Sequence, residues 1–208
     1  MDIIDNQASQ YDVRSMLQDE LLPEEQILWS GQPDASVIFT KADAIRIPFS
    51  LLWGGFACFW EYMALGGVRG MNLHNSPDAI ATIFPLFGIP FVLMGLYFVF
   101  GRFFYKRYMK LRTYYVLTNK RVLAFTGKDA RKLRAVRLDT LSNIEKNIDP
   151  SGFGTVIFGN KSPMAFFDDS GMEFFNRQYG EPTMAFFGIR EARQVYDIAN
   201  RLVYEKHS

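Results

Sequence analysis

The chain has one cysteine, two histidines and two long stretches almost without charge. Cys58 alone forms no disulfide within the chain and no cysteine-based metal site. His74 and His207 lie far apart in the sequence and near no group of carboxylates. The first residues lack a basic region followed by an apolar core, so no cleaved signal peptide is expected. We therefore predict a protein that is not an enzyme, with no catalytic residues, no metal site and no cofactor.

The two stretches poor in charge are long and apolar. Ile47 to Leu65 contains a single charged residue, Glu61, and Ile80 to Gly101 contains none. About 20 mostly apolar residues cross the hydrocarbon core of a bilayer as a helix, and glycine and proline, present in both stretches, are common in such helices. The pattern predicts a transmembrane hairpin at 46–101, with spans at about 47–65 and 80–101. The alternative is a buried core hairpin of a soluble protein, although such helices are usually shorter.

Charge is distributed unevenly along the chain. Residues 1–100 hold 4 Lys/Arg and 11 Asp/Glu, whereas residues 101–208 hold 19 and 11. Lysine and arginine are enriched in cytoplasmic segments close to a span, and five of them follow the second stretch directly, at residues 102–112. The loop between the stretches has only Arg69. This asymmetry predicts a multi-pass protein of the inner membrane with both termini in the cytoplasm.

Outside the hairpin, short runs typical of strands alternate with turn residues. Residues 1–23 form an acidic, polar tail with a short helix expected at 13–22. Asn119-Lys120 predicts a tight turn between two strands, and the apolar positions of 190–206 recur with helical spacing. Strands are expected at 26–30, 36–40, 112–118, 121–126, 132–138, 143–148, 154–158 and 183–187, with a further strand or short helix near 172–177.

Several segments resemble bacterial membrane proteins that carry a pleckstrin-homology-like (PH-like) domain and a two-helix transmembrane hairpin. They are Glu25-Gln-Ile-Leu-Trp-Ser-Gly-Gln-Pro, Ile47-Pro-Phe-Ser-Leu-Leu-Trp-Gly-Gly-Phe, Gly88 to Gly101, Thr113-Tyr-Tyr-Val-Leu-Thr-Asn-Lys-Arg-Val-Leu and Phe187-Gly-Ile-Arg-Glu-Ala-Arg-Gln-Val-Tyr. The resemblance implies an α+β membrane protein whose cytoplasmic part is a bent, seven-stranded antiparallel β-barrel capped by a C-terminal helix. It also implies that the hairpin is inserted near the start of this domain, with 24–45 before it and 102–206 after it.

Two groups of basic residues are candidate sites for lipid headgroups or a partner. Arg102, Lys106 and Lys110 recur every four residues, so a helical extension of the second span places them in line. Lys120, Arg121 and Arg134 belong to a second group around two loops, together with Lys128, Arg131 and Lys132. Each lysine or arginine close to an anionic leaflet contributes about 1 kcal/mol to binding. The alternatives are a topology signal for the first group and a solvated barrel rim for the second; nucleic acid is disfavoured because the patch is tethered at the bilayer.

Acidic residues offer two further candidates. Glu61 lies about 21 Å beyond Ile47 along a helix, near the outer interface of the predicted span. It is either a functional acid within the membrane or a residue of the interfacial belt beside Trp60 and Tyr62. Asp168-Asp169 with Glu173 is a weak candidate for a carboxylate cluster.

These observations favour a non-enzymatic integral membrane protein that presents a PH-like interaction domain at the cytoplasmic face. Its expected partner is another protein, a second copy of the chain, or anionic lipid headgroups. The second hypothesis, from a different class, is a small subunit of a transporter or channel, which needs to oligomerise because two spans are few for a pore.

Overall fold

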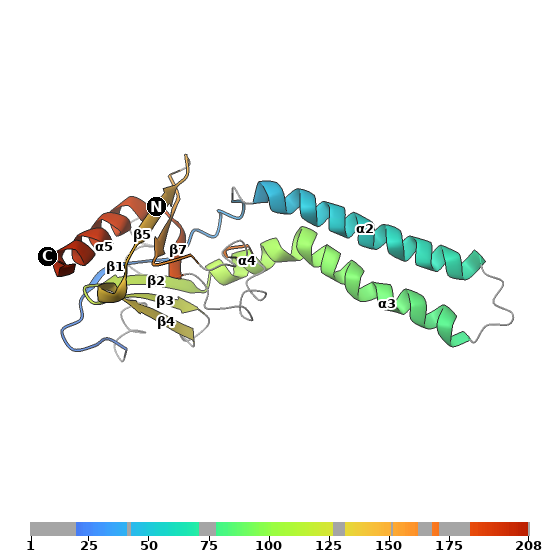
Figure 1. Cartoon of the computed structure of the whole chain (residues 1–208), viewed down its shortest axis with the longest axis horizontal. Coiled ribbons are helices and arrows are strands. Elements are labelled where there is room, and N and C mark those ends of the chain that lie inside the picture. Colours follow the sequence, from blue (N-terminus) through green and yellow to red (C-terminus); the bar gives the residue numbers. More distant parts are fainter. Residues whose placement is uncertain are drawn as a thin grey trace. The chain divides into compact units, whose positions relative to one another are not determined.

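The structure is a computed structural model that describes residues 20–40, 43–70, 78–126, 132–150, 152–161, 168–170 and 184–207. It is a mixed α+β fold with two antiparallel sheets and a C-terminal helix (Figure 1). The described residues form two compact units. The sheet unit comprises those up to Ile38 and from Lys106 onward, and the helical unit is Phe39–Tyr105.

The seven described strands of the sheet unit form a four-stranded and a three-stranded sheet, in the orders β1-β2-β3-β4 and β5-β6-β7. The first sheet contains β1 (Ile27–Gly31), β2 (Thr113–Thr118), β3 (Arg121–Thr126) and β4 (Lys132–Arg137). The second contains β5 (Ile144–Ile148), β6 (Gly154–Phe158) and β7 (Met184–Ile189). Trp29 of β1 lies opposite Leu117 of β2. The strand before the helical unit therefore pairs with the first strand after it, as the resemblance implied.

The described strands form two antiparallel sheets with no pairing between them, so they do not make a closed barrel. The chain leaves the first sheet through a 3-10 turn, Leu138–Thr140, that follows β4 directly. Leu138 and Leu141 are buried on either side of this turn. Burial of these two leucines redirects the backbone into the second sheet, so β4 and β5 do not continue one ladder.

Phe186 of β7 lies at the centre of the core between the sheets. Its ring stacks on Tyr115 of β2 at a centroid distance of 4.5 Å and on Trp29 of β1 at 5.6 Å. Phe158 of β6 meets it edge to face at 4.9 Å. Helix α5 (Ala192–His207) adds Val195 and other apolar residues to the same core. One aromatic cluster thus joins both sheets.

Most of the expected strands and the C-terminal helix are confirmed to within three residues, but the strand at 36–40 is wrong. Asp34 accepts hydrogen bonds from the backbone N–H and the hydroxyl of Ser36. An aspartate that binds the backbone two residues on forms a turn instead of a strand. The helix expected at 13–22 is absent from its described part, Glu20–Leu22, and the rest of it and the element near 172–177 lie outside the described residues.

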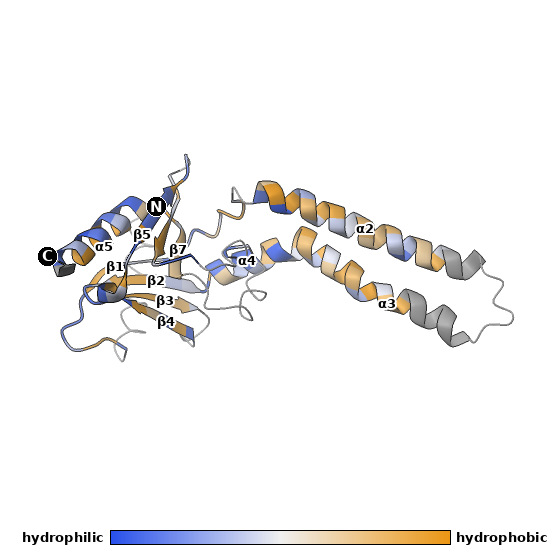
Figure 2. Cartoon of the chain, viewed as in Figure 1, coloured by the Kyte–Doolittle hydropathy of each residue, from blue (hydrophilic) through white to orange (hydrophobic). Residues whose placement is uncertain are grey.

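The helical unit is an antiparallel hairpin of α2 (Asp43–Gly70) and α3 (Asp78–Leu96). A π-helical turn, Tyr97–Gly101, follows α3 and leads into α4 (Arg102–Lys110). Of the residues available for this test, one helical segment, Leu86–Lys110, is long and apolar enough to cross a membrane. Apolar residues also predominate in α2, but polar positions interrupt them (Figure 2). A helical hairpin is therefore present, and one described helical segment has the length and composition that a membrane span requires.

Small residues let the two helices of the hairpin approach closely. A Cβ atom placed on Gly95 of α3 would lie 3.0 Å from the Cα of Gly54 of α2. Ala57 and Ala64, which follow Gly54 on the same face of α2, are buried. Small residues at such contacts are typical of helices that pack in a membrane.

Candidate functional site

The three evenly spaced cationic side chains of helix α4 are buried. Arg102, Lys106 and Lys110 lie four residues apart, so the prediction that they share one face of a helix is confirmed. Their exposed fractions are 0%, 3% and 4%. Lysine and arginine are almost never buried without a partner. The contacts of each therefore decide what it can do.

Lys106 and Lys110 line a hollow of about 160 Å³ in the sheet unit, together with Arg134 of β4. The rest of its wall comes from α4, β2, β3 and β7, from the segment before the hairpin and from residues 168–170. These other residues are Pro33, Met109, Thr113, Tyr115, Ala124, Thr126, Asp169, Met184, Ala185 and Phe187. Three of the six predicted site residues thus meet in one pocket, which is called the cationic pocket below.

Asp169 supplies the negative charge of the cationic pocket. Its Oδ2 atom lies 3.3 Å from the ammonium of Lys106, and its Oδ1 atom lies 3.8 Å from that of Lys110. The backbone of Asp169 has a φ of 49°, in the left-handed region that aspartate and asparagine tolerate better than most residues. Sequence reasoning singled out Asp169 for a carboxylate cluster and missed its pairing with α4, since no local spacing connects the two.

Lys110 is held by the backbone as well as by Asp169. Its ammonium donates a hydrogen bond of 2.8 Å to the carbonyl of Val37. A Cβ atom on Gly188 of β7 would lie only 3.0 Å from this ammonium, and Gly188 has a φ of 61°. Glycine at this position therefore permits both the backbone conformation and the approach of the lysine. Neither role was predicted from the sequence.

Two buried lysines of the cationic pocket share one carboxylate. The Oδ2 atom of Asp169 faces Lys106, and its Oδ1 atom faces Lys110. The ammonium of Lys106 is buried and has no hydrogen-bond partner among the residues that the structure describes. An anion that enters the pocket would supply the missing acceptor, and charge-assisted hydrogen bonds of this kind are the strong ones.

Asp34 lies near Lys110 but is engaged elsewhere. Its carboxylate accepts hydrogen bonds from Ser36 and from Arg190, the latter at 2.9 Å. Burial raises the pKa of Asp34, but the hydrogen bonds from Ser36 and Arg190 outweigh burial, so the pKa lies below its usual value. Asp34 thus remains ionised and committed to these partners.

Lys120 and Arg121 do not line the cationic pocket; their side chains bind the segment before β1. Arg121 donates to the carboxylate of Glu25 at 2.9 Å, and Lys120 donates to the carbonyl of Pro23 at 2.7 Å. Thr118 donates to the same carboxylate at 2.7 Å. The turn that joins β2 to β3 is therefore hydrogen-bonded to the segment that leads into β1. Whether Lys120 and Arg121 also bind a partner stays a prediction.

Arg102 lies in the helical unit and faces Asp43 at the start of α2. The guanidinium of Arg102 is 3.2 Å from the carboxylate of Asp43, and Arg46 lies 3.9 Å from it. Asp43 also accepts hydrogen bonds from the backbone N–H and the hydroxyl of Thr40. The pair joins the beginning of α2 to the beginning of α4, at the open end of the hairpin.

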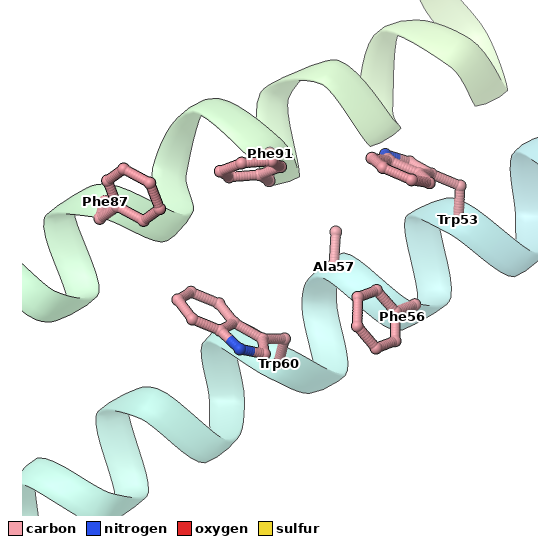
Figure 3. Close-up of a pocket in the computed structure, with 6 residues that line it drawn as sticks. All are labelled: Trp53, Phe56, Ala57, Trp60, Phe87 and Phe91. Carbon is pink, nitrogen blue, oxygen red and sulfur yellow. The ribbon is translucent and has the colours of Figure 1, made fainter.

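A second cavity lies within the helical unit and is lined almost wholly by aromatic rings. It measures about 220 Å³ and is formed by both helices of the hairpin (Figure 3). Its lining residues are Trp53, Phe56, Ala57 and Trp60 from α2 and Phe87 and Phe91 from α3. Glu61 follows Trp60 directly, and its Oε2 atom is buried without a hydrogen-bond partner in the described part of the chain.

No protein-family model, curated protein or solved structure matches the chain. Within the residues open to such a search, no group of three or more His, Cys, Asp or Glu side chains is arranged to hold a metal ion. Asp168 and Asp169 are described, whereas Glu173 and His74 lie outside the described residues. The cationic pocket is thus the candidate site with the most definite chemistry.

Proposed function

We propose that the chain is an integral membrane protein whose PH-like domain binds an anionic lipid headgroup in the cationic pocket at the cytoplasmic face. It acts by binding and not by catalysis. The observation that carries this proposal is the buried ammonium of Lys106, which shares one carboxylate with Lys110 and has no hydrogen-bond partner in the described chain.

Exposure of the apolar side chains of the hairpin supports the membrane part of the proposal. Leu52 and Phe59 of α2 are 74% and 61% exposed, and Leu93 of α3 is 60% exposed. The core hairpin of a soluble protein would bury such residues, because extensive exposed apolar surface marks contact with a membrane or a partner. A lipid environment would cover these exposed side chains.

The arrangement of elements supports the PH-like part. Four and three antiparallel strands are followed by a helix whose apolar face enters the core. The Glu25 segment and the Thr-Asn-Lys-Arg turn at 118–121, which carried much of the resemblance, bind each other directly. The resemblance thus rests on residues that cooperate in one contact.

The lipid part of the proposal rests on where the basic residues lie in the chain. The apolar run ends at Gly101, and Lys106 follows it by little more than one helical turn. A headgroup phosphate offers several acceptor oxygens to neighbouring cations. The ammonium of Lys106 has no hydrogen-bond acceptor in the described part of the chain. Anionic lipids are concentrated in the cytoplasmic leaflet, the side on which we expect the basic segment.

The test uses the full-length protein in nanodiscs of phosphatidylcholine that contain a minority of phosphatidylglycerol. Native mass spectrometry counts the phosphatidylglycerol molecules that stay bound on release. Replacing Lys106 and Lys110 by glutamine removes about 2 kcal/mol of attraction, or an affinity ratio of about 30. The single variant Arg134→Gln, at a half-buried position, removes about 1 kcal/mol, or a factor of about 5.

The matched control is Arg193→Gln with Arg201→Gln, which removes two exposed charges from α5. Wild type and control are expected to retain the anionic lipid equally. Equal retention by the pocket variants would contradict the proposal. Release of the wild type with a second protein or a second copy, and no anionic lipid, would assign the pocket to a protein partner instead.

A further inference from the structure

The aromatic cavity of the hairpin has a carboxylate beside it. A Cβ atom placed on Gly88 of α3 would lie 1.7 Å from Oε2 of Glu61 and 2.8 Å from Cζ3 of Trp60, so these two atoms are at most 4.5 Å apart, the sum of both distances. Trp60 lines the cavity. One oxygen of Glu61 therefore lies next to the cavity wall.

This oxygen has no hydrogen-bond partner in the described part of the chain. Glycine at position 88 makes room for the carboxylate, since a Cβ atom there would force the side chain of Glu61 to move. Carboxylates in an apolar environment are costly unless they are paired or protonated. Within a membrane, such a residue marks a functional site by default.

The aromatic rings and the carboxylate attract the same kind of ligand, a cation. Trp60 of α2 lies across the cavity from Phe87 and Phe91 of α3, and the ring of Trp53 points from α2 toward α3 (Figure 3). Faces of aromatic rings attract cations, tryptophan most strongly, and cages of such rings bind quaternary ammonium groups. A carboxylate beside aromatic rings suits a positively charged head attached to an apolar chain.

We propose that the hairpin binds an amphipathic ammonium ion in this cavity, with the cationic head at Glu61 and Trp60 and the alkyl chain along the remaining rings. The site is separate from the cationic pocket and carries the opposite charge. It gives the hairpin a ligand of its own, in addition to its role as an anchor.

The test measures binding of dodecyltrimethylammonium to the full-length protein in dodecyl maltoside, by the tryptophan fluorescence to which Trp53 and Trp60 of the cavity contribute. Dodecanol, which has the same chain without charge, is the matched ligand. We expect a saturable change with the ammonium ion and an affinity for dodecanol at least tenfold weaker. This comparison uses the wild type and does not depend on how any variant folds.

The variant Glu61→Gln is expected to weaken binding of the ammonium ion at least tenfold. Glu205→Gln, which removes an exposed charge from α5, is expected to leave it unchanged. Equal affinities for dodecanol and the ammonium ion, or full binding by Glu61→Gln, would overturn the proposal and make the cavity a groove for acyl chains. Absence of a saturable change in the wild type would overturn it as well.

Discussion

Replacing Asp169 by asparagine is expected to destabilise the sheet unit and at the same time to strengthen anion binding in the cationic pocket. The carboxylate lies 3.3 Å from Lys106 and 3.8 Å from Lys110, and both lysines are at least 95% buried. Asparagine has nearly the same shape and accepts a φ of 49°. The substitution therefore removes the charge and leaves the backbone undisturbed.

Removal of one partner from a buried ion pair costs about 3–5 kcal/mol, because it leaves an uncompensated charge. The lower value applies here, since Lys110 keeps its hydrogen bond to the carbonyl of Val37. For a chain of this size, about 3 kcal/mol lowers the melting temperature by roughly 6–12 °C. The substitution removes the carboxylate that Lys106 and Lys110 share, so an anion binds more tightly to the variant.

The assay compares thermal unfolding of the wild type and Asp169→Asn in nanodiscs with and without phosphatidylglycerol. A ligand at one hundred times its Kd stabilises the folded protein by about 2.7 kcal/mol. The anionic lipid should therefore raise the melting temperature of the variant more than that of the wild type. Equal stability of the two proteins without the lipid would refute the assigned ion pairs, and equal shifts with it would refute the anion site.

Three further results follow from contacts in the two units. Phe186→Ala removes the ring that joins both sheets and should cost about 3–5 kcal/mol of unfolding free energy in denaturant titrations. Gly95→Leu should force the hairpin helices apart and lower the melting temperature of the protein. Gly55→Leu should leave the melting temperature unchanged, because a Cβ atom at position 55 meets nothing within 4 Å. Burial raises the pKa of Glu25, but its hydrogen bonds and its ion pair outweigh burial and lower the pKa below 4.5. The stability from Glu25 is therefore present above about pH 4.5 and lost as the pH falls through its lowered pKa, and Glu25→Gln should flatten this part of a pH-dependent unfolding curve.

Local signals made part of the fold predictable. Asn119-Lys120 between two apolar runs predicts the turn between β2 and β3, because a tight turn requires only neighbouring residues. The helical spacing in 190–206 predicts α5 in the same way. The turn at Asp34 also has a local signal, in the serine two residues on, but the apolar residues after it favoured a strand.

Long-range contacts explain what could not be predicted. The spacing of the three cations of α4 is visible in the sequence, but their burial depends on Asp43 and on Asp169, which are far away in the chain. Arg121 looked like a surface charge because its partner, Glu25, lies 96 residues earlier. The break between the sheets depends on how Leu138 packs in the core, which no local pattern records.

Pairing of β1 with β2 has a consequence for biosynthesis. Trp29 leaves the ribosome 88 residues before Leu117, the residue opposite it. At 5–20 residues per second, β1 waits roughly 4–18 s for its partner strand while the hairpin is made. During this interval the backbone of β1 has an unpaired edge, which is open to pairing with other chains. Continued synthesis therefore protects the nascent chain from aggregation, and pauses between residues 70 and 118 would prolong the period of risk.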